Sequence, residues 1–368
     1  MPYFPPGQSD YNFLRHLMLI IWDTKRPITA KELSYNLAYY KTKGKPKDWF
    51  FDSLLSLMTR APSGNYVYAD VNRGTTRSGE GDFFAIPSPN PANAQDWLES
   101  LDSHFVKEGI LSLLESEIRK LKSSIGYPPS HKRNVIITIP YPHPNQSLFG
   151  KIENKKSSLN FSITGQNLTQ ASEQRLEACK WFVDQTITRW KRANYKNLHL
   201  LGFYWIYESL HYSWEIDDHW VLKELYKYIQ EKKYKFFWIP FYSSYNVHLL
   251  SDYQNFYFDC AFLQPNHMFY KNIKDVREAV LEAKKSNSGI EMEYHMDSGK
   301  EHKISRERHR RFRNYLDGGV KYGYMTESAC AYFMGFNDIY KMAVSKNKQE
   351  ESFYHDLYHF VQGDYQIP

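Results

Sequence analysis

Three glutamates lie in apolar stretches where an ionised group is unexpected. The stretch LHLLGFYWIYES, residues 198–209, is apolar and aromatic until it reaches Glu208. A second stretch, GIEMEYHM at residues 289–296, carries Glu291 and Glu293 at alternate positions. A buried carboxylate usually persists only where it is paired or has a chemical role. Cleavage of a glycosidic bond requires two carboxyls, one protonated and one ionised, so we expect these glutamates to be candidates for that chemistry.

Eight short apolar runs alternate with helical patterns and would position these glutamates. Near-continuous apolar strands separated by helices are typical of a parallel sheet buried on both faces. Eight of them in a chain of 368 residues predict a (β/α)8 TIM barrel. The expected strands lie at residues 15–22, 48–58, 134–142, 198–209, 235–242, 256–265, 289–296 and 321–328. The clearest helical patterns lie at residues 171–193, 217–233, 273–286 and 303–316.

Two long loops and a C-terminal tail complete the predicted architecture. Residues 59–92 and 143–170 follow the second and third expected strands, and the first of these is rich in Gly, Ser, Pro and Asn. Loops of this length are often functional, and on the C-terminal face of a barrel they would wall a cleft. We expect a catalytic barrel domain at residues 1–336 and a helical extension at residues 337–368 that packs on it.

An open, doubly wound sheet is the alternative fold. Such a sheet normally carries a glycine-rich phosphate-binding turn after an early strand. The chain contains neither GxGxxG nor GxxxxGK[ST]. The barrel is therefore the favoured fold, and we expect no nucleotide or other cofactor.

The barrel geometry predicts which polar residues meet. Catalytic side chains of a TIM barrel lie at the C-terminal ends of its strands, and side chains alternate along each strand. Glu208 on strand four and Glu293 on strand seven can then reach one point across the barrel mouth. We assign the acid to Glu208, whose aromatic neighbours would raise its pKa, and the nucleophile of a retaining mechanism to Glu293. Candidate substrate-binding residues are Asp52, Tyr141, His143, Tyr204, Trp238, Tyr242, Gln264, Asn266, Glu291 and His295.

Several of these residues have a structural alternative. Inward-facing glutamates can be held by an Arg or a Tyr as structural pairs, and Glu291, deeper in the barrel, is expected to be a hydrogen-bonded support. Asp52 is either a substrate ligand or a buried carboxylate that holds a neighbour. Aromatic residues make up 17% of the chain, which is often core filling but also suits stacking on sugar rings. The residues considered for such a sugar platform are Tyr141, Trp205, Trp238 and Tyr242.

Charge, hydropathy and cysteine content exclude several classes of function. The net charge is +6, and its densest source is the arginine-rich helix at residues 303–316, whose arginines are expected to be solvated while Phe312 and Leu316 face inward. We therefore expect no nucleic-acid partner. No run of 18 apolar residues suggests a membrane span, so no membrane partner is expected.

The cysteine spacing and the N-terminal residues indicate whether the protein binds a metal and in which cellular compartment it works. Cys179, Cys260 and Cys330 lack metal-ligand spacing and are expected to be buried thiols, and no zinc motif occurs, so we expect no metal. The N-terminal residues show no signal peptide, which leaves a cytoplasmic location or a start after cleavage as the two expectations.

Seven segments in order resemble one known family. They are GKPKDWFFDSLL, the IPYPHPNQ stretch with its following LFG, LGFYWIYE, KFFWIPFY, FDCAFLQPN, GIEMEY and YLDGGVKYGYM. Over about residues 14–335 the chain resembles the bacterial domain-of-unknown-function family 4855, which implies a TIM barrel of glycosidase type without a settled activity. The four-and-seven placement is also similar to a large clan of retaining glycosidases. That clan usually has Asn before its strand-four acid, whereas Tyr207 stands here, so recognition of a sugar 2-hydroxyl must come from elsewhere.

The sequence thus predicts a retaining glycoside hydrolase with a carbohydrate partner. A barrel that binds carbohydrate without cleaving it is the main alternative, and a lyase or isomerase using the same carboxylates is a third. The sugar, endo or exo action and the oligomeric state stay open at this point.

Overall fold

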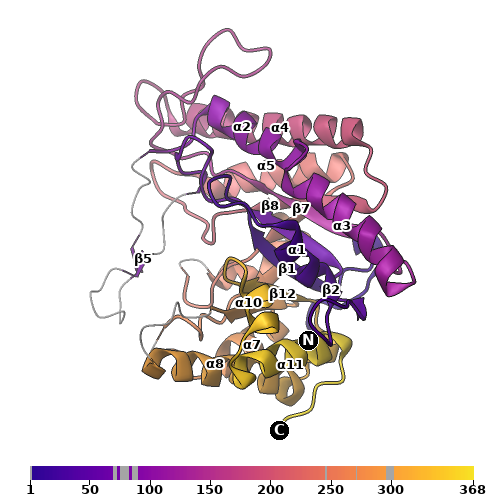
Figure 1. Ribbon diagram of the computed structural model, residues 1–368. Coiled ribbons are helices and arrows are strands. Elements are labelled where there is room, and N and C mark those ends of the chain that lie inside the picture. Colours follow the sequence, from indigo (N-terminus) through magenta and orange to yellow (C-terminus); the bar gives the residue numbers. More distant parts are fainter. Residues whose placement is uncertain are drawn as a thin grey trace.

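A closed barrel of eight parallel strands forms the centre of the molecule (Figure 1). The computed structural model describes residues 2–68, 73–74, 83–84, 90–244, 247–270, 272–295 and 302–368. Around the ring the strand order is β1-β12-β11-β10-β9-β8-β7-β4, which confirms the predicted TIM barrel. The strands are β1 (His16–Ile21), β4 (Ser53–Leu57), β7 (Arg133–Ile139), β8 (Leu198–Trp205), β9 (Lys235–Trp238), β10 (Cys260–Leu263), β11 (Gly289–Tyr294) and β12 (Cys330–Met334).

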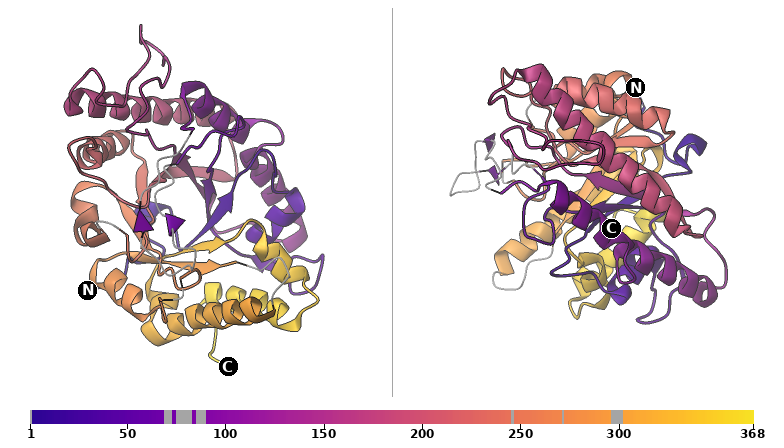
Figure 2. Two further views of the ribbon diagram at one scale, coloured as in Figure 1. Left: turned by 90° about the vertical axis from the view of Figure 1, so that its left-hand side faces the viewer. Right: turned by 90° about the horizontal axis from the view of Figure 1, so that it is seen from above.

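Helices surround the barrel, as the end-on view in Figure 2 shows. They are α1 (Ala30–Leu37), α2 (Ala94–Phe105), α3 (Ile110–Ile125), α4 (Leu168–Ala193), α5 (Asp218–Glu231), α6 (Tyr253–Phe256), α7 (Arg277–Lys285), α8 (His302–Tyr322), α9 (Tyr324–Glu327), α10 (Asp338–Val344) and α11 (Lys348–Gln362). Short elements are η1 (Ser9–Tyr11), β2 (Ala38–Tyr39), β3 (Asp48–Trp49), β5 (Arg73–Gly74), β6 (Phe83–Phe84) and η2 (Val247–Asp252). The predicted long loops are present, since α2 begins 37 positions after β4 ends at residue 57 and α4 begins 29 positions after β7 ends at residue 139.

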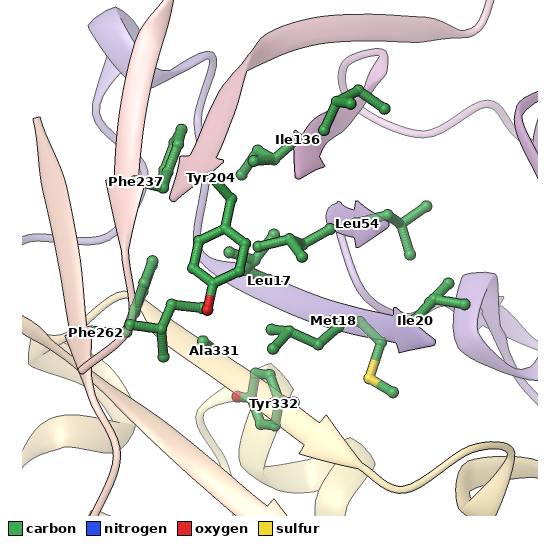
Figure 3. Packing of buried hydrophobic residues seen from close by; sticks show 14 of the residues in the cluster. Leu17, Met18, Ile20, Leu54, Ile136, Tyr204, Phe237, Phe262, Ala331 and Tyr332 are labelled. Carbon is green, nitrogen blue, oxygen red and sulfur yellow. The ribbon is translucent and has the colours of Figure 1, made fainter. Parts of the chain in front are cut away.

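Side chains fill the barrel from several strands at once. Figure 3 shows Leu17, Ile136 and Tyr204 among the residues of the buried cluster. This packing explains why the strands read as near-continuous apolar runs, because one face meets the barrel interior and the other meets the helices. The three cysteines are free and buried, as expected.

The eighth strand was predicted in the wrong place. Residues 321–328 are mostly helical, because α8 continues to Tyr322 and α9 follows after Gly323, whose φ of 84° interrupts the helix. The strand is β12, which pairs with both β11 and β1. Glu327 therefore ends no strand and instead pairs with Lys284 at 3.1 Å near the surface. The alternating pattern KYGYM is compatible with a strand, but here helix formation and the glycine break prevail.

Residues 337–368 form α10 and α11, which lie in the outer layer (Figure 1). Phe353 of α11 packs against Phe312 of α8 with ring centroids 5.3 Å apart. It also contacts Tyr294 of β11 at 6.4 Å. The tail therefore packs directly on the strand that carries two of the candidate glutamates.

Candidate active site

A cavity of about 340 Å³ lies at the C-terminal ends of the barrel strands. This end is where TIM barrels place their active sites. Its wall combines two carboxyls with several aromatic rings. The lining residues are Leu19, Leu57, Thr59, Tyr68, Tyr204, Ile206, Tyr207, Glu208, Phe241, Gln264, Asn266, Phe269, Tyr270, Glu291 and Phe333. Of the predicted site residues, five therefore line the cavity: Tyr204, Glu208, Gln264, Asn266 and Glu291.

Glu208 lies at the rim, three residues beyond the end of β8, and is partly exposed. The residue before it is held firmly. The carbonyl of Tyr207 accepts a hydrogen bond from Trp238 Nε1 at 3.1 Å, and its ring lies 4.6 Å from that of Tyr141. The backbone that presents Glu208 is thus fixed by packing below it, while the carboxyl faces the cavity.

Glu291 lies deeper and is only 2% exposed. Burial raises its pKa well above the ordinary value, and the charges of Glu293 and Glu208 raise it further. Burial also raises the pKa of Tyr204, with contributions from Glu208 and Glu291. These groups are therefore close enough to interact electrostatically, and burial favours the protonated form of Glu291.

Glu293 is 1% exposed and lies outside the cavity lining. Burial raises its pKa to about 8, opposed by a hydrogen bond that Tyr315 donates to Oε2 and reinforced by the charge of Glu208. The backbone amides of Asn266 and Met268 also lower its pKa. Oε1 is buried and has no hydrogen-bond partner among the residues that the structure describes. Glu293 thus combines donors that favour its anion with a second oxygen that is enclosed by the protein.

Tyr270 lies close enough to both predicted catalytic carboxyls for their charges to affect its pKa. It lines the cavity, and burial raises its pKa to about 12, with further contributions from Glu208 and Glu293. One hydroxyl therefore lies in the field of both carboxyls. No strand-end or alternation pattern indicated this residue, although it closes the QPNHMFY segment directly after the sixth strand.

Helix α8 holds the loop that carries Tyr270. Arg311 is 6% exposed, and its Nη1 donates to the carbonyl of Tyr270 at 2.8 Å and to that of His267. The His267 Nε2 lies 3.0 Å from Asn314 Nδ2. The expectation that the arginines of this helix are all solvated was wrong for Arg311, because loop carbonyls replace water as its partners.

A buried ion pair lies behind the other side of the cavity. Arg175 Nη2 lies 2.5 Å from Asp218 Oδ1, and both side chains are almost fully buried. Tyr141 donates to Asp218 Oδ2 at 3.1 Å, and the backbone amide of His211 donates to the same oxygen at 3.1 Å. This network connects β7, α4, the loop after β8 and α5. Sequence patterns did not reveal it, because Arg175 and Asp218 are separated by 43 positions.

Tyr141 and His143 belong to this network rather than to the cavity wall. The Arg175 guanidinium lies 5.4 Å from the Tyr141 ring centroid. Burial and, to a smaller extent, the charge of Arg175 lower the pKa of His143 to about 4, so this imidazole is neutral at pH 7.

Three other predicted residues also lie outside the lining. Trp238 is fully buried and stacks on Phe258 at 5.2 Å, so it offers no face to a sugar. Tyr242 is partly buried just beyond β9, and its backbone amide donates to Gln264 at 2.9 Å. His295 follows β11 and pairs with Asp338 at 3.2 Å. Trp205, considered for the sugar platform, is likewise fully buried.

Asp52 lies at the opposite end of the barrel, just before β4 begins. Its carboxylate accepts hydrogen bonds from the His16 amide at 3.0 Å, from the Arg15 amide at 3.2 Å and from Ser53 Oγ at 2.5 Å. It therefore holds the start of β1 to the start of β4. Of the two expectations for Asp52, the structure fits the buried carboxylate that holds a neighbour.

The protonated carboxyls predict a pH dependence of stability. An unfolded glutamate titrates near 4.5, whereas folded Glu293 titrates near 8 and Glu291 well above 4.5. Between these values the folded state binds more protons, so the free energy of unfolding falls as pH rises, by about 1.4 kcal/mol per pH unit and group. We expect Glu293→Gln to flatten this fall between pH 5 and 8 in urea denaturation curves. Parallel pH dependences for variant and wild type would contradict the assignment.

The described part of the chain has neither a metal-binding cluster nor a membrane-spanning helix. It contains no cluster of three His, Cys, Asp or Glu side chains arranged to hold a metal ion. None of its helices combines the length and the apolar character needed to cross a membrane.

The strand topology and the cavity define the class, a (β/α)8 barrel with an acidic, tyrosine-lined site at its C-terminal mouth. The family model described as Domain of unknown function (DUF4855) matches residues 22–359, and the chain belongs to this family. This confirms the resemblance found in the sequence. No curated protein sequence matches the chain.

Solved structures with the same overall arrangement are distant. A chitinase of glycoside hydrolase family 18 from Pseudoalteromonas aurantia has 10% identity and a TM-score of 0.44, covering 92% of this chain and 98% of that chain. A second such chitinase, from Flavobacterium johnsoniae, has 11% identity and a TM-score of 0.42, covering 94% of each. A tryptophan synthase from Pyrococcus furiosus has 10% identity and a TM-score of 0.39, covering 98% of this chain and 99% of that chain. Such low identities and TM-scores say nothing about activity.

Proposed function

We propose that this protein is a glycoside hydrolase whose acting carboxyls are Glu208 and Glu293. The observation that carries the proposal is the electrostatic coupling between Glu208, in the wall of an aromatic cavity after β8, and Glu293, buried on β11 outside that wall. The charge of Glu208 raises the pKa of Glu293, and the charges of both carboxyls raise the pKa of Tyr270 in the cavity wall. The cavity of about 340 Å³ falls within the range of about 300–1,000 Å³ that is usual for small-molecule sites.

The electrostatics support different roles for the two carboxyls. When Glu208 carries a proton, its charge no longer raises the pKa of Glu293, so Glu293 ionises more readily. The hydrogen bond from Tyr315 and the nearby backbone amides then stabilise the anion. We therefore assign the proton donor to Glu208 and the nucleophile to Glu293.

The proposed reaction has two steps that conserve protons. Glu208 transfers its proton to the glycosidic oxygen as the bond from that oxygen to the anomeric carbon breaks, and the Glu293 carboxylate bonds to the anomeric carbon. In the second step a water molecule gives a proton to the Glu208 carboxylate, and the water oxygen displaces the Glu293 carboxylate from the anomeric carbon. The sugar leaves with its original anomeric configuration, and both carboxyls return to their starting states. In this scheme Tyr204 and Tyr270 border the reacting atoms.

The burial of Glu293 favours a second candidate, a barrel that binds carbohydrate without cleaving it. A carboxyl that is 1% exposed and bonded to Tyr315 fits a structural pair. In that case sugar would bind to the cavity and no reducing ends would appear.

Release of reducing ends from a panel of oligo- and polysaccharides and aryl glycosides tests the proposal. Glu293→Ala is expected to abolish the release that wild type shows. Azide, which fits the vacated space, should then restore turnover of an activated aryl glycoside and yield a glycosyl azide of inverted configuration. Glu291→Ala is the matched control and should show no azide product. A Glu293→Ala variant as active as wild type would contradict the assignment.

A further inference from the structure

The loop that follows Glu208 exposes two aromatic side chains. Trp214 is 83% exposed and Tyr212 is 64% exposed. Both lie between the end of β8 and the start of α5, and by this topology they lie on the C-terminal face of the barrel. Of the nine tryptophans, Trp214 is the one classed as exposed. Leaving such a ring in water is unfavourable, so its presence at the catalytic end suggests a partner.

The loop is built as a short hairpin rather than as a loose segment. Tyr212 and Asp217 form an antiparallel bridge, and the amide of Ser213 donates to the carbonyl of Ile216 at 2.8 Å. Asp217 caps α5 by accepting from the Trp220 amide at 2.9 Å. Trp214 lies within this turn, so little chain entropy is lost when a ligand stacks on it.

The hairpin is continuous with the cavity through packed rings. Tyr207 lines the cavity, and its ring stacks on His211 with centroids 5.3 Å apart and an interplanar angle of 10°. The backbone amide of His211 donates to Asp218 Oδ2 at 3.1 Å, which fixes the base of the hairpin. Tyr212 follows immediately, with its ring 5.9 Å from that of His219. The Tyr207–His211 stack thus joins the cavity wall to the base of the hairpin that carries the exposed rings.

We propose that Trp214 and Tyr212 form an outer subsite that holds a sugar ring of a chain extending out of the cavity. Flat aromatic faces stack on the C–H faces of pyranose rings, and Tyr212 adds a hydroxyl for hydrogen bonding. The substrate is then an oligo- or polysaccharide rather than a single sugar on a small aglycone. This inference deepens the proposed function and rests on it for the direction of the chain.

Binding measured against chain length tests this subsite. The probes are immobilised oligosaccharides of increasing length from several sugar classes, and the intact protein is bound to them. Quenching of tryptophan fluorescence by iodide is the second readout. Trp214→Ala is expected to weaken binding of long chains by roughly tenfold and to leave the shortest ligands unaffected. Long chains should also protect the wild-type tryptophan fluorescence from iodide. Phe256→Ala, which removes a 44% exposed ring from the segment between β9 and β10, is the control and should change neither readout.

Each other result overturns the inference. Equal affinity of Trp214→Ala and wild type for all lengths, or a loss that is the same for the shortest ligand, would refute an outer subsite. Self-association in wild type that Trp214→Ala abolishes, without an effect on sugar binding, would assign the ring to an interface between copies. Length-dependent binding without any release of reducing ends would refute the hydrolase and leave the subsite standing, so the two failures are distinguishable.

Discussion

Glu208→Gln is expected to lower kcat by about 10²–10⁴-fold, the usual contribution of a general acid. Glutamine keeps the size of the side chain but holds no proton for the leaving oxygen. Because Glu208 lies at the rim on a backbone held by Trp238, the substitution should not disturb the fold. Affinity for the substrate should therefore persist while turnover is lost. Steady-state kinetics together with binding to the inactive variant would measure both.

Leaving-group dependence makes this test sharper. Substrates with an acidic aryl leaving group need little protonation. The rate of their first step in Glu208→Gln should therefore be close to that of wild type. Glu215→Gln is the matched control, because Glu215 is an exposed carboxyl on the same loop. If Glu208→Gln retained full activity on natural glycosides, or if Glu215→Gln lost as much, the assignment of the acid would be wrong.

Asp218→Asn is expected to lower the free energy of unfolding by about 3–5 kcal/mol, because it leaves a buried guanidinium without its counter-charge. Arg175 has 2% of its side chain exposed, and Asp218 has none. Tyr141 and the His211 amide lose the same acceptor charge, so the loop that carries Glu208 should loosen as well. Urea denaturation would measure the loss of stability. The separate changes in KM and in kcat relative to wild type would report on the loop.

The neighbouring residue provides the control for this prediction. Asp217 caps α5, and asparagine caps helices about as well as aspartate, so Asp217→Asn should cost less than about 0.5 kcal/mol. A loss of under about 1 kcal/mol in Asp218→Asn would mean that the ion pair contributes little. In that case packing alone would hold the loop after β8.

The fold was predictable because parallel strands and helices leave strong patterns. Seven of the eight apolar runs overlap barrel strands, and Glu208 was placed at the mouth because it follows the end of its strand. The strand pattern put Glu293 rather than Glu291 nearest the mouth, whereas Glu291 lines the cavity. Strand β12 was missed because its short run CAYFM follows a helical segment that alternates like a strand. As a result Phe333 of the cavity wall was also missed.

The errors among aromatic and polar residues have a common cause. A strand buried on both faces gives no signal that separates an inward ring from an outward one, and Trp238 was therefore taken for a sugar platform. Asp52 could not be placed from sequence, because a carboxylate just before a strand and one at its end look alike in an apolar run. Tyr270 and Arg175 depend on contacts between segments far apart in the chain, which no local pattern encodes.

Covalent trapping of the sugar on the enzyme tests the central claim most directly. The protein would be incubated with a panel of activated 2-deoxy-2-fluoro glycosides, and its intact mass and its labelled peptide would be determined by mass spectrometry. We expect a mass increase of one glycosyl residue, carried by the peptide of β11 and located on Glu293. A label on Glu208 or Glu291, or active hydrolysis of natural substrates without any trapped intermediate across the panel, would contradict a retaining reaction that proceeds through Glu293.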